Sequence, residues 1–99
     1  MTVNKNQTVA GSSQSDAEAM LADHVQVASA SADQGLVLRS GVEGDIRSVC
    51  NKSNQAIKLY PPTNGAFNAG ATNFPLTIPP SGAAIVVCID AHTYHAVKS

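Results

Sequence analysis

Short stretches in which apolar and polar residues alternate, separated by turn-forming residues, constrain the fold of this chain more than any other feature. Val25 and Val27 alternate with polar neighbours, which is the period-two pattern of a half-buried strand. Pro61-Pro62 ends one such stretch, because proline donates no hydrogen bond to a sheet, and Pro79 to Gly82 forms another turn. The pattern predicts seven strands, at residues 24–29, 36–38, 45–51, 55–60, 74–78, 83–89 and 93–97.

Seven short strands at this spacing indicate an all-β fold, specifically a small antiparallel β-sandwich or barrel. Lys52-Ser53-Asn54 has the length of a hairpin loop and predicts direct pairing of the strands on either side of it. From Ala83 to Ile89, both faces of the strand are apolar. We expect this strand either to lie at the centre of a sandwich or to cover an intersubunit surface with one of its faces.

Residues 1–23 differ in composition from the rest and predict an extended polar N-terminal arm, followed by a β module over residues 24–99. Residues 1–15 are mostly Asn, Gln, Thr, Ser and Gly, which bury too little apolar surface to offset the entropy of ordering. We expect this segment to be disordered alone and to order against a neighbouring subunit. Ser15 to Glu18 matches a capping box, so a short helix is expected over residues 16–23, with an apolar stripe of only one to two turns.

Charge and hydropathy argue against two classes of partner. The 99 residues include six Lys and Arg and seven Asp and Glu, for a net charge of −1, and the basic residues are scattered. Binding of nucleic acid needs clustered cations that neutralise phosphates, so we expect no nucleic-acid partner. No run of eighteen apolar residues is present and the first residues lack the apolar region of a signal peptide. We therefore expect no membrane partner and synthesis in the cytosol.

The residue types that catalyse reactions or bind metals in other proteins form no recognisable site in this sequence, so we expect no catalytic residue, no cofactor and no metal. His92 and His95 are three positions apart, and on a strand such side chains point to opposite faces, which prevents them from sharing a metal ion. Asp90 lies near His92, but the sequence has no Gly-x-Ser-x-Gly turn of a serine hydrolase. We expect the side chains of Asp16, Glu18 and Asp23 to be charges in the first turn of a helix. We expect His24 to be an isolated, exposed histidine.

The two cysteines, Cys50 and Cys88, each lie within an apolar stretch. We expect both to be buried as small hydrophobic residues on strands of the same module. We also expect both to be reduced, because a protein assembled in the cytosol meets a reducing environment. The alternative is a disulfide between two strands, which would close a loop of about 38 residues and stabilise the fold by about 3–4 kcal/mol.

The order of these elements resembles a small β module of tailed-bacteriophage virion proteins. The resemblance covers residues 24–97 and rests on a strand ending in Cys50-Asn51, on Ile57 to Pro62, on Asn64 to Gly70, and on the apolar strand followed by Thr93-Tyr94-His95. Such modules typically have a strand into asparagine, a Val-Tyr-Pro-Pro-like strand, an Ile-Asn-Gly-like turn, an apolar strand and a closing aromatic strand. This chain departs from the pattern by one extra residue before Gly70 and by a tyrosine at position 94, where tryptophan is common.

The resemblance implies a non-enzymatic structural protein of the phage particle, since similar proteins include capsid decoration (cement) proteins, head fibres and tail-fibre segments. Decoration of the capsid surface, with the major capsid protein as partner and assembly in the host cytoplasm, is the first expectation. The alternative is a tail or fibre component that binds a host-surface glycan or another tail protein. A domain of this size cannot bury both faces of the strand from Ala83 to Ile89 unaided, so we also expect a homo-oligomer, a trimer.

Overall fold

The computed structural model of the chain describes residues 2–11, 13–31, 34–68, 70–90 and 92–98. These residues form strands and no helix, which confirms the expected all-β class. All seven expected strands are present, and three further strands (β1, β2 and β7) were not expected. The strands are β1 (Val3–Gln7), β2 (Glu18–Ala19), β3 (His24–Val27), β4 (Gly35–Val37), β5 (Ile46–Asn51), β6 (Ile57–Tyr60), β7 (Ala66–Phe67), β8 (Leu76–Ile78), β9 (Ala83–Asp90) and β10 (Thr93–Lys98).

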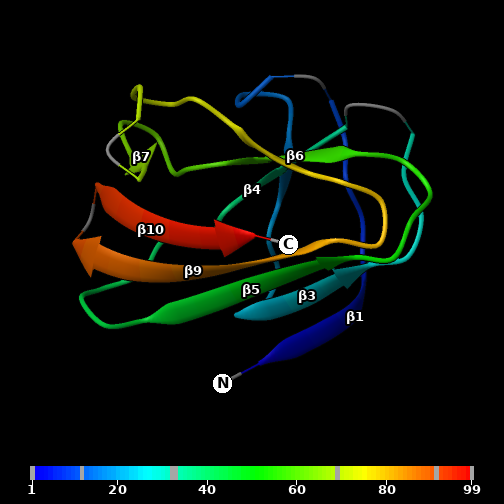
Figure 1. Cartoon of the computed structure of the whole chain (residues 1–99), viewed down its shortest axis with the longest axis horizontal. Coiled ribbons are helices and arrows are strands. Elements are labelled where there is room, and N and C mark those ends of the chain that lie inside the picture. Colours follow the sequence, from blue (N-terminus) through cyan, green and yellow to red (C-terminus); the bar gives the residue numbers. More distant parts are fainter. Residues whose placement is uncertain (1, 12, 32–33, 69, 91, 99) are drawn as a thin grey trace.

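The strands form two mixed sheets, and consecutive strands alternate between them over most of the chain (Figure 1). Sheet A has the order β1-β3-β5-β9-β10-β7, and sheet B has the order β2-β4-β6-β8. Because the chain crosses to the other sheet after each strand from β1 to β5, β1, β3 and β5 pair in parallel in sheet A, and β2, β4 and β6 pair in parallel in sheet B. The winding is solenoid-like, and β8, β9 and β10 complete the sheets with antiparallel pairs.

The expected antiparallel pairing is wrong for five of the eight strand pairs that the structure describes, which are parallel. The expected hairpin through Lys52-Ser53-Asn54 is also wrong, because β5 belongs to sheet A and β6 to sheet B. A period of two specifies which side chains face the core but leaves the identity of the neighbouring strand open. Parallel neighbours follow here because the connections from β1 to β6 cross between the sheets instead of turning back within one of them.

Asn51, a fully buried polar residue, holds the crossing from sheet A to sheet B in place. Its side-chain amide donates to the carbonyl oxygens of Gln55 (2.8 Å), Ile78 (3.2 Å) and Pro79 (3.1 Å). Its Oδ1 accepts from the backbone amide and the hydroxyl of Ser53, at 3.0 and 2.6 Å. One side chain therefore joins the end of β5 to the turn before β6 and to the end of β8.

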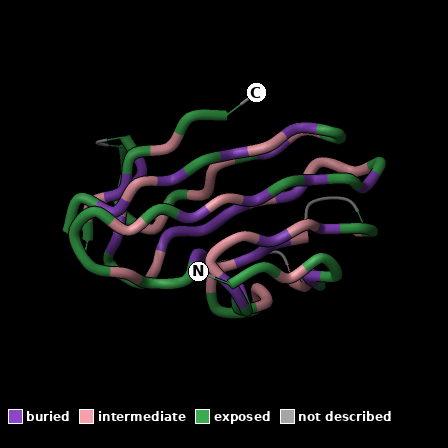
Figure 2. Tube along the Cα trace, turned by 90° about the horizontal axis from the view of Figure 1, so that it is seen from below, coloured by how far each residue is buried: buried purple, intermediate pink, exposed green. Residues whose placement is uncertain are grey.

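The core lies between the two sheets. Buried and more exposed positions alternate along the strands, as the colours of Figure 2 show. At one end of the core, the fully buried Tyr94 packs edge-on against Phe67, with ring centroids 6.3 Å apart and an interplanar angle of 64°. The fully buried aliphatic side chains come from both sheets: Val27, Val49 and Val86 from sheet A, and Leu36, Ile57, Leu59 and Ile78 from sheet B.

The helix expected over residues 16–23 is not formed. Glu18–Ala19 instead form β2, in parallel register with β4, and the amide of Met20 donates to the carbonyl of Val37 at 3.1 Å. A helix with one to two turns of apolar residues gains little burial. In the extended conformation, by contrast, Met20 and Ala22 both reach the core, being 5% and 3% exposed. Tertiary packing therefore outweighs the local capping signal.

Polar side chains attach the N-terminal segment to the rest of the chain. β1 pairs in parallel with β3. Gln7, only 2% exposed, donates to the carbonyl of Ala19 (3.0 Å) and accepts from the amide of Leu21 (3.0 Å). Gln14 donates to the carbonyl of Pro61 at 2.7 Å. These bonds give the segment partners within its own chain, and the division into an arm over residues 1–23 and a module over residues 24–99 stays a prediction.

The two cysteines occupy opposite sides of sheet A. Both thiols are free, which confirms the expected reduced state. Cys88 is buried, and burial raises the pKa of its thiol. Cys50 is exposed, so its expected burial is wrong. The reason is the alternation of the strand: Val49 faces the core, and the next residue therefore faces outward.

Candidate binding surface

The outward side of sheet A carries five of the eight large apolar side chains that are exposed among the described residues, and one of them is Val3 on β1, opposite His24. Ile46 on β5, Ile85 and Ile89 on β9, and Val97 on β10 are 49%, 54%, 45% and 77% exposed. They alternate with inward-facing residues such as the fully buried Val86. We use the term outer face for ten outward positions of β3, β5, β9 and β10, namely His24, Gln26, Ile46, Ser48, Cys50, Ile85, Val87, Ile89, His95 and Val97.

The pairing register brings the apolar side chains of the outer face together. Ile85 lies between Ser48 on β5 and Val97 on β10. Val87 lies between Ile46 and His95 on the same two strands. Side chains directly opposite each other on adjacent strands have Cβ atoms about 5 Å apart, so these residues form a continuous strip across three strands. Contiguous exposed apolar surface of this kind marks a contact site more often than singly scattered side chains do.

The outer face carries no Asp, Glu, Lys or Arg at any of its ten positions. The outward side of sheet B differs, since Lys58 on β6 and Thr77 on β8 are opposite each other there, next to the buried Ile57 and Leu59. The centres of protein–protein interfaces are depleted of charged residues, whereas phosphate binding requires cations. The outer face therefore suits contact with an uncharged protein surface.

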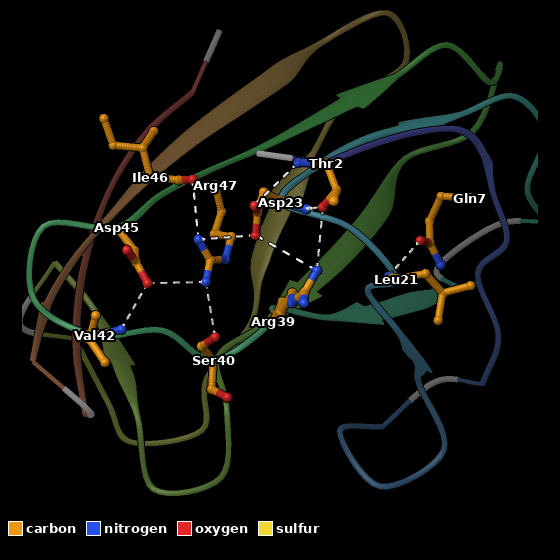
Figure 3. A network of polar contacts seen from close by, with 10 residues as sticks. All are labelled: Thr2, Gln7, Leu21, Asp23, Arg39, Ser40, Val42, Asp45, Ile46 and Arg47. Atoms are coloured by element: carbon orange, nitrogen blue, oxygen red, sulfur yellow. Dashed lines mark hydrogen bonds and ion pairs between the residues drawn. The ribbon is translucent and has the colours of Figure 1, made fainter.

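A polar cluster at the buried Arg47 joins β5 to the N-terminal segment (Figure 3). The guanidinium is 3.3 Å from Oδ1 of Asp23 through Nη1 and 3.4 Å from Oδ2 of Asp45 through Nη2. Nη2 also donates to the carbonyl of Ser40 at 3.0 Å. Asp23 accepts in addition from the amide of Thr2 at 3.4 Å. Both carboxylates are thus engaged by the same cation, which indicates a structural role.

Acidification is expected to weaken this cluster through Asp23. Burial raises the pKa of Asp23, but Arg47, the Thr2 amide and Arg39 lower it by more, so that the pKa lies below its ordinary 3.8. A carboxyl whose pKa is depressed by folding adds stability above its unfolded-state pKa and loses that contribution as the pH falls through the folded-state pKa. Between about pH 5 and about pH 2, urea unfolding should therefore show a smaller loss of unfolding free energy for Asp23→Asn than for the wild type. Equal losses would contradict this role.

The histidines do not converge on a shared site. His92 and His95 are exposed, His92 in the turn after β9 and His95 on the outer face. Asp90 closes that turn by accepting from the amide of His92 at 2.8 Å. His24, expected to be isolated and exposed, is half-buried, and its Nδ1 lies 2.6 Å from the hydroxyl of Ser48. Within the described part of the chain, no three His, Cys, Asp or Glu side chains are grouped so that they could hold a metal ion.

A hollow of about 570 Å³ lies where β1 and β3 end. Residues 6–9, residues 28–31 and Gln34 line it, and none of these side chains is acidic, basic or a thiol. The hydroxyl groups of Thr8, Ser29 and Ser31 therefore have no ionisable side chain beside them in the lining that could act as a general base. No helix of the described residues is long and apolar enough to cross a membrane.

Comparisons with known proteins assign no relative to this chain: no family model, no curated protein and no solved structure matches it. The outer face is therefore identified from the structure of this chain alone. Its sequence signal is the stretch from Ala83 to Ile89, which is apolar on both faces. In the structure Ala84, Val86 and Cys88 face the core, while Ile85 and Ile89 face outward.

Proposed function

We propose that the chain is a non-enzymatic structural protein of a tailed-phage particle, which decorates and stabilises the capsid with the major capsid protein as its partner. The observation that carries this proposal is the outer face, whose apolar and uncharged surface suits lasting contact with another protein. The resemblance of residues 24–97 to the β modules of phage virion proteins supports the same function. An apolar contact face and a resemblance to virion modules are both typical of a protein that functions by binding to the surface of an assembly.

In this proposal the two sheets form a small sandwich whose two outward sides differ in polarity. The outer face of sheet A provides the assembly contact, and the polar outward side of sheet B, with Lys58 and Thr77, faces solvent. A contact of ordinary size buries about 800 Å² per partner, about a sixth of the 5136 Å² of accessible surface of this chain. The subunit sits across junctions between capsomers, where the area of the contact resists the internal pressure of the packed head.

The test is to locate the chain on purified particles of the phage that encodes it. Antibody labelling and electron microscopy should place it in many copies on the outer surface of the head. Absence from the particles, or a position confined to the tail tip, would contradict the proposal. A tail-tip position would instead favour a fibre component that binds a host glycan.

A further inference from the structure

We infer that polar side chains close the edges of both sheets, so that the chain is protected from joining other molecules by strand addition. This inference concerns the edges of the sheets and is independent of the partner proposed for the outer face. An edge strand presents unpaired backbone N–H and C=O groups, which a strand of another molecule can bind. The edge strands are β1 and β7 in sheet A and β2 and β8 in sheet B (Figure 1).

Asn68 closes the edge of β10 beyond the end of the short β7. β7 pairs only with Thr93 and Tyr94, and the backbone amide of Asn68 then donates to the carbonyl of Tyr94 at 2.9 Å. Alternation along the strand directs the backbone groups of Ala96 to the same edge. There the side-chain amide of Asn68 donates to the carbonyl of Ala96 at 3.1 Å and accepts from its N–H at 2.8 Å. Two bonds exchanged with one residue are the pattern of an antiparallel pair, so this side chain takes the place of a strand.

Gln7 closes the edge of β2 in sheet B in a similar way. The amide of Met20 donates to the carbonyl of Val37 on β4 at 3.1 Å. The backbone groups of its neighbours Ala19 and Leu21 therefore point away from β4, toward the edge of the sheet. The side-chain amide of Gln7 donates to the carbonyl of Ala19 and accepts from the amide of Leu21, each at 3.0 Å. A side-chain amide has the same donor and acceptor as a peptide group, so it satisfies both edge groups.

The other two edges are protected by lysines. On β8, the carbonyl of Thr77 accepts from the ammonium group of Lys98 at 2.9 Å. β1 carries the exposed Lys5, and its register shifts after Asn4, and both features discourage strand addition. An open edge beside an exposed apolar side chain is an aggregation site, and Val97 on β10 is 77% exposed. Loss of the Asn68 cap, next to Val97, should therefore promote association.

The experiment compares the wild type with three variants. Asn68→Gly removes the cap, and glycine adopts the positive φ of 52° at this position without strain. Asn68→Asp keeps an acceptor for the Ala96 amide and places a charge on the edge, which discourages strand addition. Asn64→Gly makes the same change at another exposed asparagine with a positive φ, 68°, in the turn before β7. Because both positions are exposed, all variants should keep the fold, which circular dichroism verifies.

Hydrogen exchange at low concentration should show the Ala96 amide exchanging at least about tenfold faster in Asn68→Gly than in the wild type. At rising concentration, sedimentation velocity should give Asn68→Gly a weight-average mass at least about twofold above that of the wild type. Asn68→Asp and Asn64→Gly should sediment as the wild type does. An unchanged exchange rate at Ala96 would overturn the inference, as would an Asn68→Gly protein with the mass of the wild type. Equal association of Asn68→Asp would also overturn it, because a charged edge should not accept a strand.

Discussion

Asn51→Asp is expected to lower the free energy of unfolding by at least about 3 kcal/mol, although it only replaces an NH₂ group by an oxygen. The amide of Asn51 donates to three carbonyl oxygens, those of Gln55, Ile78 and Pro79, and the residue is fully buried. An ionised aspartate has no proton to donate, so three acceptors would face a buried negative charge. Urea denaturation of the variant and the wild type measures the difference.

The matched control is Asn54→Asp, the same chemical change three residues later at an exposed position. It should alter the unfolding free energy by no more than about 0.5 kcal/mol, as surface substitutions usually do. If Asn51→Asp were equally harmless, the side chain would not hold the crossing between the sheets. The position of β6 beside β4 would then need a different cause.

Tyr94→Ala should cost about 3–5 kcal/mol, the range found when a large aromatic side chain is removed from a core. Tyr94 is fully buried, and its ring packs against that of Phe67. A Cβ at Gly65 would lie 3.0 Å from Tyr94 Cε2, so the ring also closes the space beside that glycine. Truncation leaves a cavity in the core beside the ring of Phe67.

Thermal or urea unfolding tests this expectation, with His95→Ala as the control. His95 is the next residue on β10 and is exposed on the outer face. Its truncation should change the unfolding free energy by less than about 0.5 kcal/mol. A similar small effect at Tyr94 would mean that the contact between β10 and β7 contributes little to the stability of the fold.

The sequence is informative about which segments are strands and which side chains face the core. Alternation places Val25 and Val27 correctly on the inner side of sheet A, because a period of two follows directly from backbone geometry. The same rule, applied strictly, would also have placed Cys50 outward. Its expected burial came from the apolar residue next to it in the sequence, and neighbours along a strand lie on opposite faces.

The same reasoning could not predict which strands pair with each other. A polar loop such as Lys52-Ser53-Asn54 is compatible with a hairpin and with a crossing to the other sheet, and the choice depends on Asn51, whose partners Ile78 and Pro79 lie more than 25 residues away. β1 and β2 were missed for a related reason. Gln7 and Gln14 hold them in place through hydrogen bonds, and a hydrophobic pattern does not reveal such bonds.

The outer face was foreseen in part, because the stretch from Ala83 to Ile89 is apolar on both faces and a strand of a small two-layer protein buries only one. What the sequence left open was the contribution of the neighbouring strands. Ile46 and Val97 are separated by half the chain, and only the register of β5, β9 and β10 brings them onto one surface. A surface that several strands form together can be predicted only once the pairing of those strands is known.

The most direct test of the outer face as an assembly surface is the reactivity of Cys50, the exposed thiol on that face, towards a maleimide in purified particles. Cys88 is buried and should not compete for the reagent. If the outer face is covered by a protein partner, Cys50 should react at least about tenfold more slowly in the particles than in the free protein. Equal rates of labelling would show that the face stays open to solvent after assembly and would contradict the central claim.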